Sequence, residues 1–213
     1  MSIKVKFCGI TSLGDAQKAV LSGVNALGFV FFKNSRRCID RENAKFIIEN
    51  LPPFIASVGV FVNEDIEYIK ECVELCGLSV IQLHGDEDVK YALKLKGLGL
   101  KVKLIKAIRV KDEESLKVIN KYPVDAILLD SYTEGFYGGT GVTFDKSLIA
   151  LAINYGRPIV LSGGLNADNV YDRIKDATPY AVDVSSGIES APGKKDFALM
   201  QKFMAQVRRF ETD

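Results

Sequence analysis

The chain has 213 residues, 47% of them hydrophobic, so it is long and apolar enough to bury a substantial core. Its 28 basic and 27 acidic residues leave a net charge of +1, which provides no overall field for nucleic acid or anionic membranes. No segment reaches the roughly 18 apolar residues that a membrane helix needs, and the start MSIKVKF lacks the apolar core of a signal peptide. We therefore expect a cytoplasmic protein that binds neither nucleic acid nor membranes.

Short apolar runs recur along the chain, and each is typical of a strand that is buried on both faces. The eight runs are IKVKFCGI (3–10), ALGFVF (26–31), FIASVGVFV (54–62), SVIQLHG (79–85), VKLIKAIRV (102–110), DAILLD (125–130), PIVLSGG (158–164) and AVDVSSG (181–187).

Stretches with helical periodicity lie between these runs, and several begin after Ser, Asp or Asn and end at Gly, as capped helices do. They are LGDAQKAVLSG (13–23), RENAKFIIENL (41–51), DIEYIKECVELCG (65–77), DEDVKYALKLKG (86–97), EESLKVINKY (113–122), DKSLIALAINYG (145–156), NADNVYDRIKD (166–176) and DFALMQKFMAQVRRF (196–210).

This alternation predicts an α/β protein, a closed parallel sheet in a (β/α)8 TIM barrel, at roughly 27 residues per strand–helix unit. No linker or change of composition divides the chain, so we expect one domain over residues 1–213. The alternative is an open doubly wound sheet. It is disfavoured because CGITSLGD, after the first strand, has neither the GxGxxG spacing nor the Walker lysine of a nucleotide-binding loop.

The four cysteines are expected to be free thiols in a reducing compartment. Cys72 and Cys76 have the i, i+4 spacing of a helix, and the chain has one histidine and no second cysteine pair. This pattern favours small buried side chains over a zinc site. We expect no metal site.

In a (β/α)8 barrel the active site lies at the carboxyl ends of the strands, where this chain has Cys8 and Asp130. A cysteine in an apolar run is usually a core residue, but Cys8 is at the strand end and Gly9 leaves space over it. Positive potential would lower the pKa of such a thiol from about 8.5 and make it a general base. A carboxyl group such as Asp130 that enters an apolar site favours its protonated form and can act as general acid.

Glycine-rich turns end the seventh and eighth strands, the position where such barrels often bind phosphate. The predicted phosphate-binding residues are Gly163, Gly164, Ser185, Ser186 and Gly187. A long loop after Asp130 contains GGTG, and we expect Gly139 and Gly141 to line the substrate site.

Two further side chains at strand ends are candidates for the site. His84, the only histidine, follows the fourth strand and is either a catalyst or a residue that lines the substrate site. Arg37 follows the second strand and could bind a carboxylate in bidentate fashion, and the sequence leaves open whether Arg36 contributes.

Strand alternation also predicts a buried ion pair. If Cys8 faces the active site, Lys6 faces the barrel interior, where an ammonium group needs a partner. The eighth strand closes beside the first, and Asp183 lies two residues before Ser185. We therefore expect Lys6 to pair with Asp183 and to add positive potential at Cys8.

Taken together, the motifs resemble the phosphoribosylanthranilate isomerase family of tryptophan biosynthesis. The similar segments occur in family order between Val5 and Asp196: KFCGIT, GFVF…SRR, VGVFVN, IQLHGDE, LLD, GGTG…TFD, VLSGGLN and AVDVSSGIE…PGKKD. The ordered set is far more specific than any one of its members.

The resemblance implies a cofactor-free Amadori rearrangement of N-(5′-phosphoribosyl)anthranilate to 1-(2-carboxyphenylamino)-1-deoxyribulose 5-phosphate. It implies that Cys8 is the general base, that Asp130 is the general acid and that Arg37 binds the anthranilate carboxylate. The glycine turns would bind the phosphate of this small-molecule partner. Alternatives are a related phosphosugar isomerase of the histidine pathway and a non-catalytic phosphate-binding barrel. The oligomeric state does not follow from the sequence.

Overall fold

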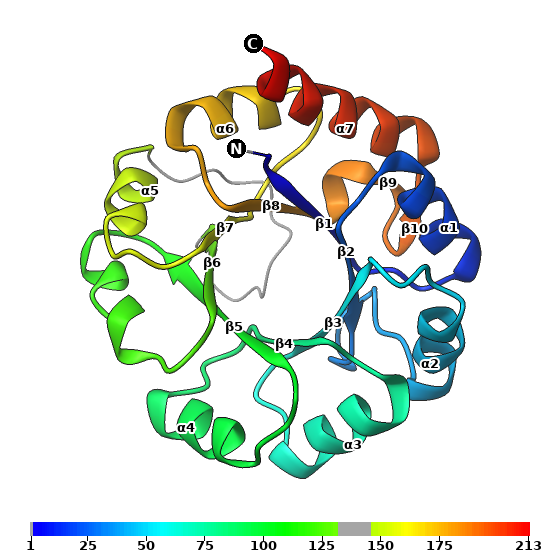
Figure 1. Ribbon diagram of the computed structural model, residues 1–213, viewed down its shortest axis with the longest axis vertical. Helices are drawn as coiled ribbons and strands as arrows, with labels where there is room; N and C mark the ends of the chain where they lie inside the picture. Colours follow the sequence, from blue (N-terminus) through cyan, green and yellow to red (C-terminus); the bar gives the residue numbers. More distant parts are fainter. Residues whose placement is uncertain (1, 132–145) are drawn as a thin grey trace.

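The computed structural model describes residues 2–131 and 146–213, and within them eight parallel strands form a closed barrel (Figure 1). The strands pair in chain order and β8 closes against β1, so the predicted (β/α)8 barrel is confirmed. The strands are β1 Lys4–Cys8, β2 Ala26–Val30, β3 Ala56–Phe61, β4 Val80–Leu83, β5 Lys103–Val110, β6 Ala126–Ser131, β7 Ile159–Leu161 and β8 Ala181–Val184.

Helices surround the barrel in Figure 1, each between two consecutive strands except the last, which follows β8. The described α-helices are α1 Leu13–Ser22, α2 Arg41–Glu49, α3 Ile66–Cys76, α4 Val89–Gly97, α5 Lys146–Ile153, α6 Val170–Ala177 and α7 Phe197–Thr212. Ser12 caps the amino terminus of α1 by accepting from the Asp15 backbone N–H, and Gly23 ends the helix in the left-handed conformation. The predicted capping signals therefore have structural counterparts.

The prediction of a helix over residues 113–122 is wrong. This segment instead forms two short 3-10 turns, η1 Glu114–Leu116 and η2 Ile119–Lys121. Its buried residues, Leu116 and Ile119, are three apart, which matches the three-residue turn of a 3-10 helix. Pro123 follows and holds Tyr122 in extended backbone, so an α-helix cannot continue.

A small hairpin after β8 was not predicted. It consists of β9 Glu189–Ala191 and β10 Lys194–Lys195, with Gly193 at a φ of 81° in its turn. The hairpin lies beside α1 (Figure 1), where the Thr11 hydroxyl donates to the Gly193 carbonyl at 2.8 Å. The Asp15 carboxylate accepts from the Lys195 backbone N–H at 3.2 Å. These contacts fix the hairpin to the first strand–helix loop and to α1.

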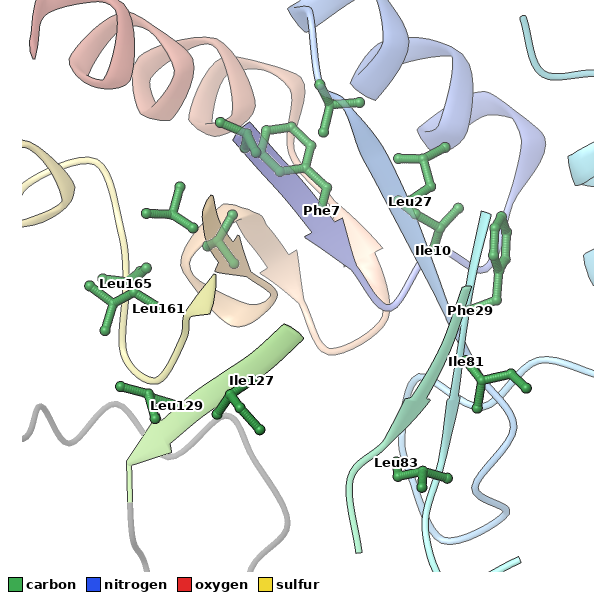
Figure 2. Close-up of a cluster of buried hydrophobic side chains, with 14 of the residues drawn as sticks. Phe7, Ile10, Leu27, Phe29, Ile81, Leu83, Ile127, Leu129, Leu161 and Leu165 are labelled. Carbon is green, nitrogen blue, oxygen red and sulfur yellow. The ribbon is translucent and has the colours of Figure 1, made fainter. Parts of the chain in front are cut away.

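The main hydrophobic core lies between the barrel and the surrounding helices, where strand side chains such as Phe7, Leu27 and Phe29 point outward (Figure 2). The Phe7 ring meets Phe203 of α7 edge-on, with 6.0 Å between centroids. Lys6, the residue before Phe7 on β1, points into the barrel and pairs there with Asp183. Alternate residues of β1 thus face the helix layer and the barrel interior.

A second, smaller apolar cluster, made by Ala107, Leu128, Val160 and Ala181 with Ile105 against it, comes from strands β5 to β8. These small and branched side chains make a packed interior of the kind expected in such barrels. Among the described residues, we find no helix whose length and apolar character would let it cross a membrane.

Candidate active site

Cys8 ends β1 at the carboxyl end of the barrel strands and is 8% exposed. Its side chain packs in a cluster with Val30 and Val60, and Phe32 packs against this cluster. Gly28 on β2 makes the space for the thiol, because a Cβ at Gly28 would lie 2.8 Å from the Cys8 Sγ. The sulfur is therefore held in a tight and mainly apolar position at the edge of the barrel.

The ion pair expected between Lys6 and Asp183 is confirmed, with 2.9 Å between Nζ and Oδ1 and side chains 6% and 5% exposed. Burial lowers the pKa of Lys6, but the charges of Asp183 and Cys8 outweigh burial and leave the pKa raised. Ser162 of the seventh strand's end also donates to Asp183 Oδ2, at 3.4 Å. The lysine is therefore a charged residue inside the barrel, next to the thiol.

The expected lowering of the Cys8 thiol pKa is wrong. Burial raises the pKa of Cys8 above its ordinary value, and this exceeds the lowering by Lys6 and Lys195. The Asp183 carboxylate raises it further. The positive charges near the thiol are real, but each is paired with a carboxylate, so little net potential remains to stabilise the thiolate.

Asp130 is buried near the end of β6, and His84 lies against it, with 3.1 Å between His84 Nε2 and Asp130 Oδ2. The amide Nε2 of Gln82 is 2.8 Å from the other ring nitrogen of His84. When Gln82 donates to Nδ1, the ring carries its proton on Nε2 and donates to the carboxylate. The structure thus joins two sequence-predicted residues, Asp130 and His84, in one hydrogen-bonded chain.

Arg37 lies in the loop after β2, with its aliphatic stem over the backbone beside Cys8. A Cβ at Gly9, which has a φ of 78°, would lie 2.5 Å from Arg37 Cδ, so only glycine fits beneath this stem. Glu189 accepts from Arg37 Nε at 2.8 Å and from Arg37 Nη2 at 2.7 Å. Arg36 is exposed, so the structure brings Arg37 rather than its neighbour to Cys8.

Glu189 also pairs with Lys195, whose side chain is fully buried and whose Nζ is 2.8 Å from Glu189 Oε1. The same ammonium group donates to the Ser185 carbonyl at 3.1 Å. Burial raises the pKa of Glu189, but Arg37 and Lys195 outweigh burial and leave it lowered. We call Arg37, Glu189 and Lys195 the Glu189 cluster.

The two glycine turns expected to bind phosphate lie against each other. A Cβ at Gly187 would be 2.0 Å from the Leu165 carbonyl oxygen, so the backbones following β7 and β8 are in contact there. Gly163 and Gly164 both have positive φ, 84° and 64°, which explains why glycine occupies both positions.

The serines of the second turn differ in their surroundings. The Ser185 hydroxyl donates to the Cys8 carbonyl at 3.0 Å, whereas Ser186 is exposed at the start of a 3-10 turn, η3 Ser186–Ile188. Ser185 therefore ties the second glycine turn to the end of β1. Gly139 and Gly141, also expected in the site, lie outside the described residues.

The comparison with protein families decides the relationship. The family model described as PRAI, N-(5′phosphoribosyl)anthranilate (PRA) isomerase, matches residues 5–206. The chain belongs to this family. Its similarity to individual members is extensive: the N-(5′-phosphoribosyl)anthranilate isomerase of Geobacter metallireducens is 46% identical over 206 residues, 97% of this chain and 99% of that protein. The Pelobacter propionicus protein of the same name is 48% identical over 202 residues, 95% of this chain and 94% of that protein.

Solved structures of the family agree in fold. The phosphoribosyl anthranilate isomerase from Thermotoga maritima is 41% identical, with a TM-score of 0.89 over 97% of this chain and 99% of that chain. Another isomerase structure, a complex with reduced 1-(o-carboxyphenylamino)-1-deoxyribulose 5-phosphate, is 40% identical with a TM-score of 0.85 over the same shares.

Three residues near the predicted family site were not singled out from the sequence: Gln82, Glu189 and Lys195. Gln82 had a usable signal, since a glutamine two residues before His84 shares its strand face. Glu189 and Lys195 flank a Pro-Gly dipeptide, which is a turn signal that could have revealed the hairpin. Nothing in the sequence links Glu189 to Arg37, 152 positions away.

Proposed function

We propose that this chain isomerises N-(5′-phosphoribosyl)anthranilate to 1-(2-carboxyphenylamino)-1-deoxyribulose 5-phosphate in tryptophan biosynthesis. The observation that carries the proposal is that this family member has Cys8 and Asp130 at the carboxyl ends of two strands of one closed barrel. A related isomerase was crystallised with the reduced form of this product, which supports a phosphorylated small molecule as the ligand. We further propose that residues 1–213 act as one domain in the cytoplasm.

Asp130 is the proposed general acid. It would donate a proton to the ribose ring oxygen as the bond from that oxygen to C1′ breaks, while the anthranilate nitrogen lone pair forms a C=N double bond to C1′. The product of this step is an open-chain iminium ion. The hydrogen bond from His84 supports a fixed carboxyl orientation during this proton transfer.

Cys8 is the proposed general base. The iminium ion makes the proton on C2′ acidic, and the thiolate of Cys8 would remove it to give an enolamine. The enolamine gains a proton at C1′ and loses the proton of its C2′ hydroxyl to become the ketone. The bonds that break and form lie within the substrate, and the protein exchanges only protons with it, so the proposed reaction requires no cofactor. Each positioned group contributes roughly 10²–10⁴-fold.

The substrate's two anionic ends need separate partners. Arg37 is the proposed partner of the anthranilate carboxylate, because its aliphatic stem lies over Gly9, next to Cys8, and its guanidinium retains donors that Glu189 does not use. The adjoining glycine turns, Gly163-Gly164 and Ser185-Ser186-Gly187, are the proposed phosphate site. Ser185 would contribute its backbone N–H there, since its hydroxyl donates to Cys8.

The test uses the fluorescence of the anthranilate ring. Mixing the protein with N-(5′-phosphoribosyl)anthranilate should make the substrate signal decay faster than in a blank without protein. Cys8→Ser should lose most of kcat, and Arg37→Ala should mainly raise KM. Equal decay rates for the unaltered protein and the blank would reject the activity. Full turnover by Cys8→Ser would reject the assignment of the base, with His84 the next candidate.

A further inference from the structure

The Glu189 cluster places two cations on one buried carboxylate. Arg37 donates from Nε and Nη2 to the two oxygens of Glu189, and Lys195 donates to Oε1, the oxygen that already accepts from Arg37 Nε. The Glu189 side chain is 4% exposed, and that of Lys195 is fully buried. This is a bidentate, charge-assisted contact and not a solvated surface pair.

The geometry leaves a defined part of Arg37 for a ligand. A guanidinium group has five N–H donors, and Glu189 uses the edge formed by Nε and Nη2. The end of the guanidinium, formed by Nη1 and the second Nη2 hydrogen, is its outer edge, which a second carboxylate can approach in bidentate fashion. The aliphatic stem of Arg37 packs on Gly9, so the side chain is held by this packing as well as by its contact with Glu189.

The carboxylate charge is needed because the two cations repel each other. Arg37 and Lys195 both lie within hydrogen-bond distance of Glu189 Oε1, so a neutral side chain at this position would leave two like charges together in a buried site. Lys195 cannot move into solvent easily, because its Nζ also donates to the Ser185 carbonyl. Arg37, which is one-fifth exposed, would be the group displaced.

We propose that Glu189 is a positioning residue that aligns Arg37 so that the outer edge of the guanidinium binds the carboxylate of the substrate. This inference rests on the proposed function, in which Arg37 is the partner of that carboxylate. Glu189 itself does not touch the substrate. It contributes to recognition by holding the arginine in one orientation before the ligand arrives, which reduces the entropy lost on binding.

The experiment compares two ligands by titration calorimetry. One is reduced 1-(o-carboxyphenylamino)-1-deoxyribulose 5-phosphate, and the other is its phenylamino counterpart, which lacks only the carboxyl group. Glu189→Gln should weaken binding of the first ligand about 10-fold and leave the second unchanged. Arg37→Ala should weaken the first ligand by on the order of 100-fold, again selectively.

The matched control is Glu87→Gln. Glu87 is an equally buried carboxylate that pairs with Lys106 at 2.7 Å on the β5 side of the barrel. Glu87→Gln and Glu189→Gln both break a buried ion pair and should both lower the stability of the fold. Because Glu87 does not contact Arg37, Glu87→Gln should leave the ratio of the two ligand affinities unchanged. If Glu189→Gln does not fold, Glu189→Asp carries the comparison, because it keeps the charge but breaks the two-point contact. It should give the same selective effect by a smaller factor.

The outcomes separate the inference from the proposed function. If the Glu189 variant weakens both ligands equally, or weakens neither, the positioning role is overturned. Selective weakening of the first ligand by Arg37→Ala still upholds the contact between Arg37 and the substrate carboxylate in that case. If Arg37→Ala is not selective either, the proposed contact between Arg37 and the substrate carboxylate fails, and the inference fails with it.

Discussion

Removing one partner of the buried pair Lys6–Asp183 should lower the free energy of unfolding far more than removing one partner of an exposed ion pair. Lys6→Met keeps a long unbranched side chain but leaves Asp183 as an uncompensated charge in the barrel, where both side chains are nearly inaccessible. Breaking a buried pair in this way costs about 3–5 kcal/mol of unfolding free energy. That is a large fraction of the stability of an ordinary domain, roughly 5–15 kcal/mol.

The double variant Lys6→Met/Asp183→Asn should be more stable than Lys6→Met alone, because no buried charge remains. Its remaining cost is that of an amide with too few partners, about 1–3 kcal/mol, since Ser162 is the neighbour that still donates to this side chain. The two substitutions should therefore be strongly non-additive. Lys103→Met is the control: Lys103 pairs with Asp125 at 3.0 Å, but the two side chains are 73% and 38% exposed. Its cost should stay below about 1 kcal/mol.

Urea unfolding followed by circular dichroism measures these differences from the midpoint, provided that the slope of the transition is unchanged. Similar costs for Lys6→Met and Lys103→Met, or additive effects in the double variant, would refute the reasoning that the first pair lies in a low-dielectric interior. The raised pKa of Lys6 adds a pH signature. The stabilisation is fully present below the lysine's ordinary pKa of 10.5 and is lost as pH rises through the higher folded value.

Three further predictions concern the site. Because burial raises the pKa of Cys8, the thiolate absorbance at about 240 nm that is lost in Cys8→Ser should still be growing above pH 9, and a Cys8 titration complete below pH 8 would contradict this. Gly28→Ala should lower kcat about 10- to 100-fold, because the added carbon would lie 2.8 Å from the Cys8 sulfur and displace it. An unchanged kcat in a folded variant would show that the position of the sulfur is not critical. Gln82→Leu should lower kcat several-fold with little loss of stability, because in the described residues Gln82 Oε1 is buried without a hydrogen-bond partner. A loss of several kcal/mol in urea unfolding would contradict this last expectation.

The barrel was predictable because its signals are local and repeated. Each apolar run predicted a strand at nearly its observed position, for example 126–131 against the expected 125–130. The segment 113–122 misled because its apolar residues fit an α-helical spacing only loosely, while Leu116 and Ile119 repeat at three residues. The proline at 123 was the stronger signal there, since it restricts the residue before it.

Side-chain pairs were predictable only where strand geometry links the partners. Lys6 and Asp183 are 177 positions apart, yet closure of β8 beside β1 and the two-residue alternation bring them together. Arg37 and Glu189 lie in a loop and a hairpin, for which no periodic rule gives the direction of a side chain. The same limit applies to the Lys195 ammonium group. The loop residues near Cys8 therefore have no signal in the sequence that places them there.

The thiol illustrates how counting charges can give the wrong sign. The sequence indicates a lysine beside Cys8, and the structure adds Lys195, but Asp183 and Glu189 pair with these two cations. The remaining potential is too small to offset burial, and the thiol pKa is raised. A raised pKa makes the thiolate scarcer but more basic, which suits removal of a carbon-bound proton once the iminium ion has formed. The cations near the sulfur therefore do not by themselves activate the thiol, because each is neutralised by a carboxylate of its own.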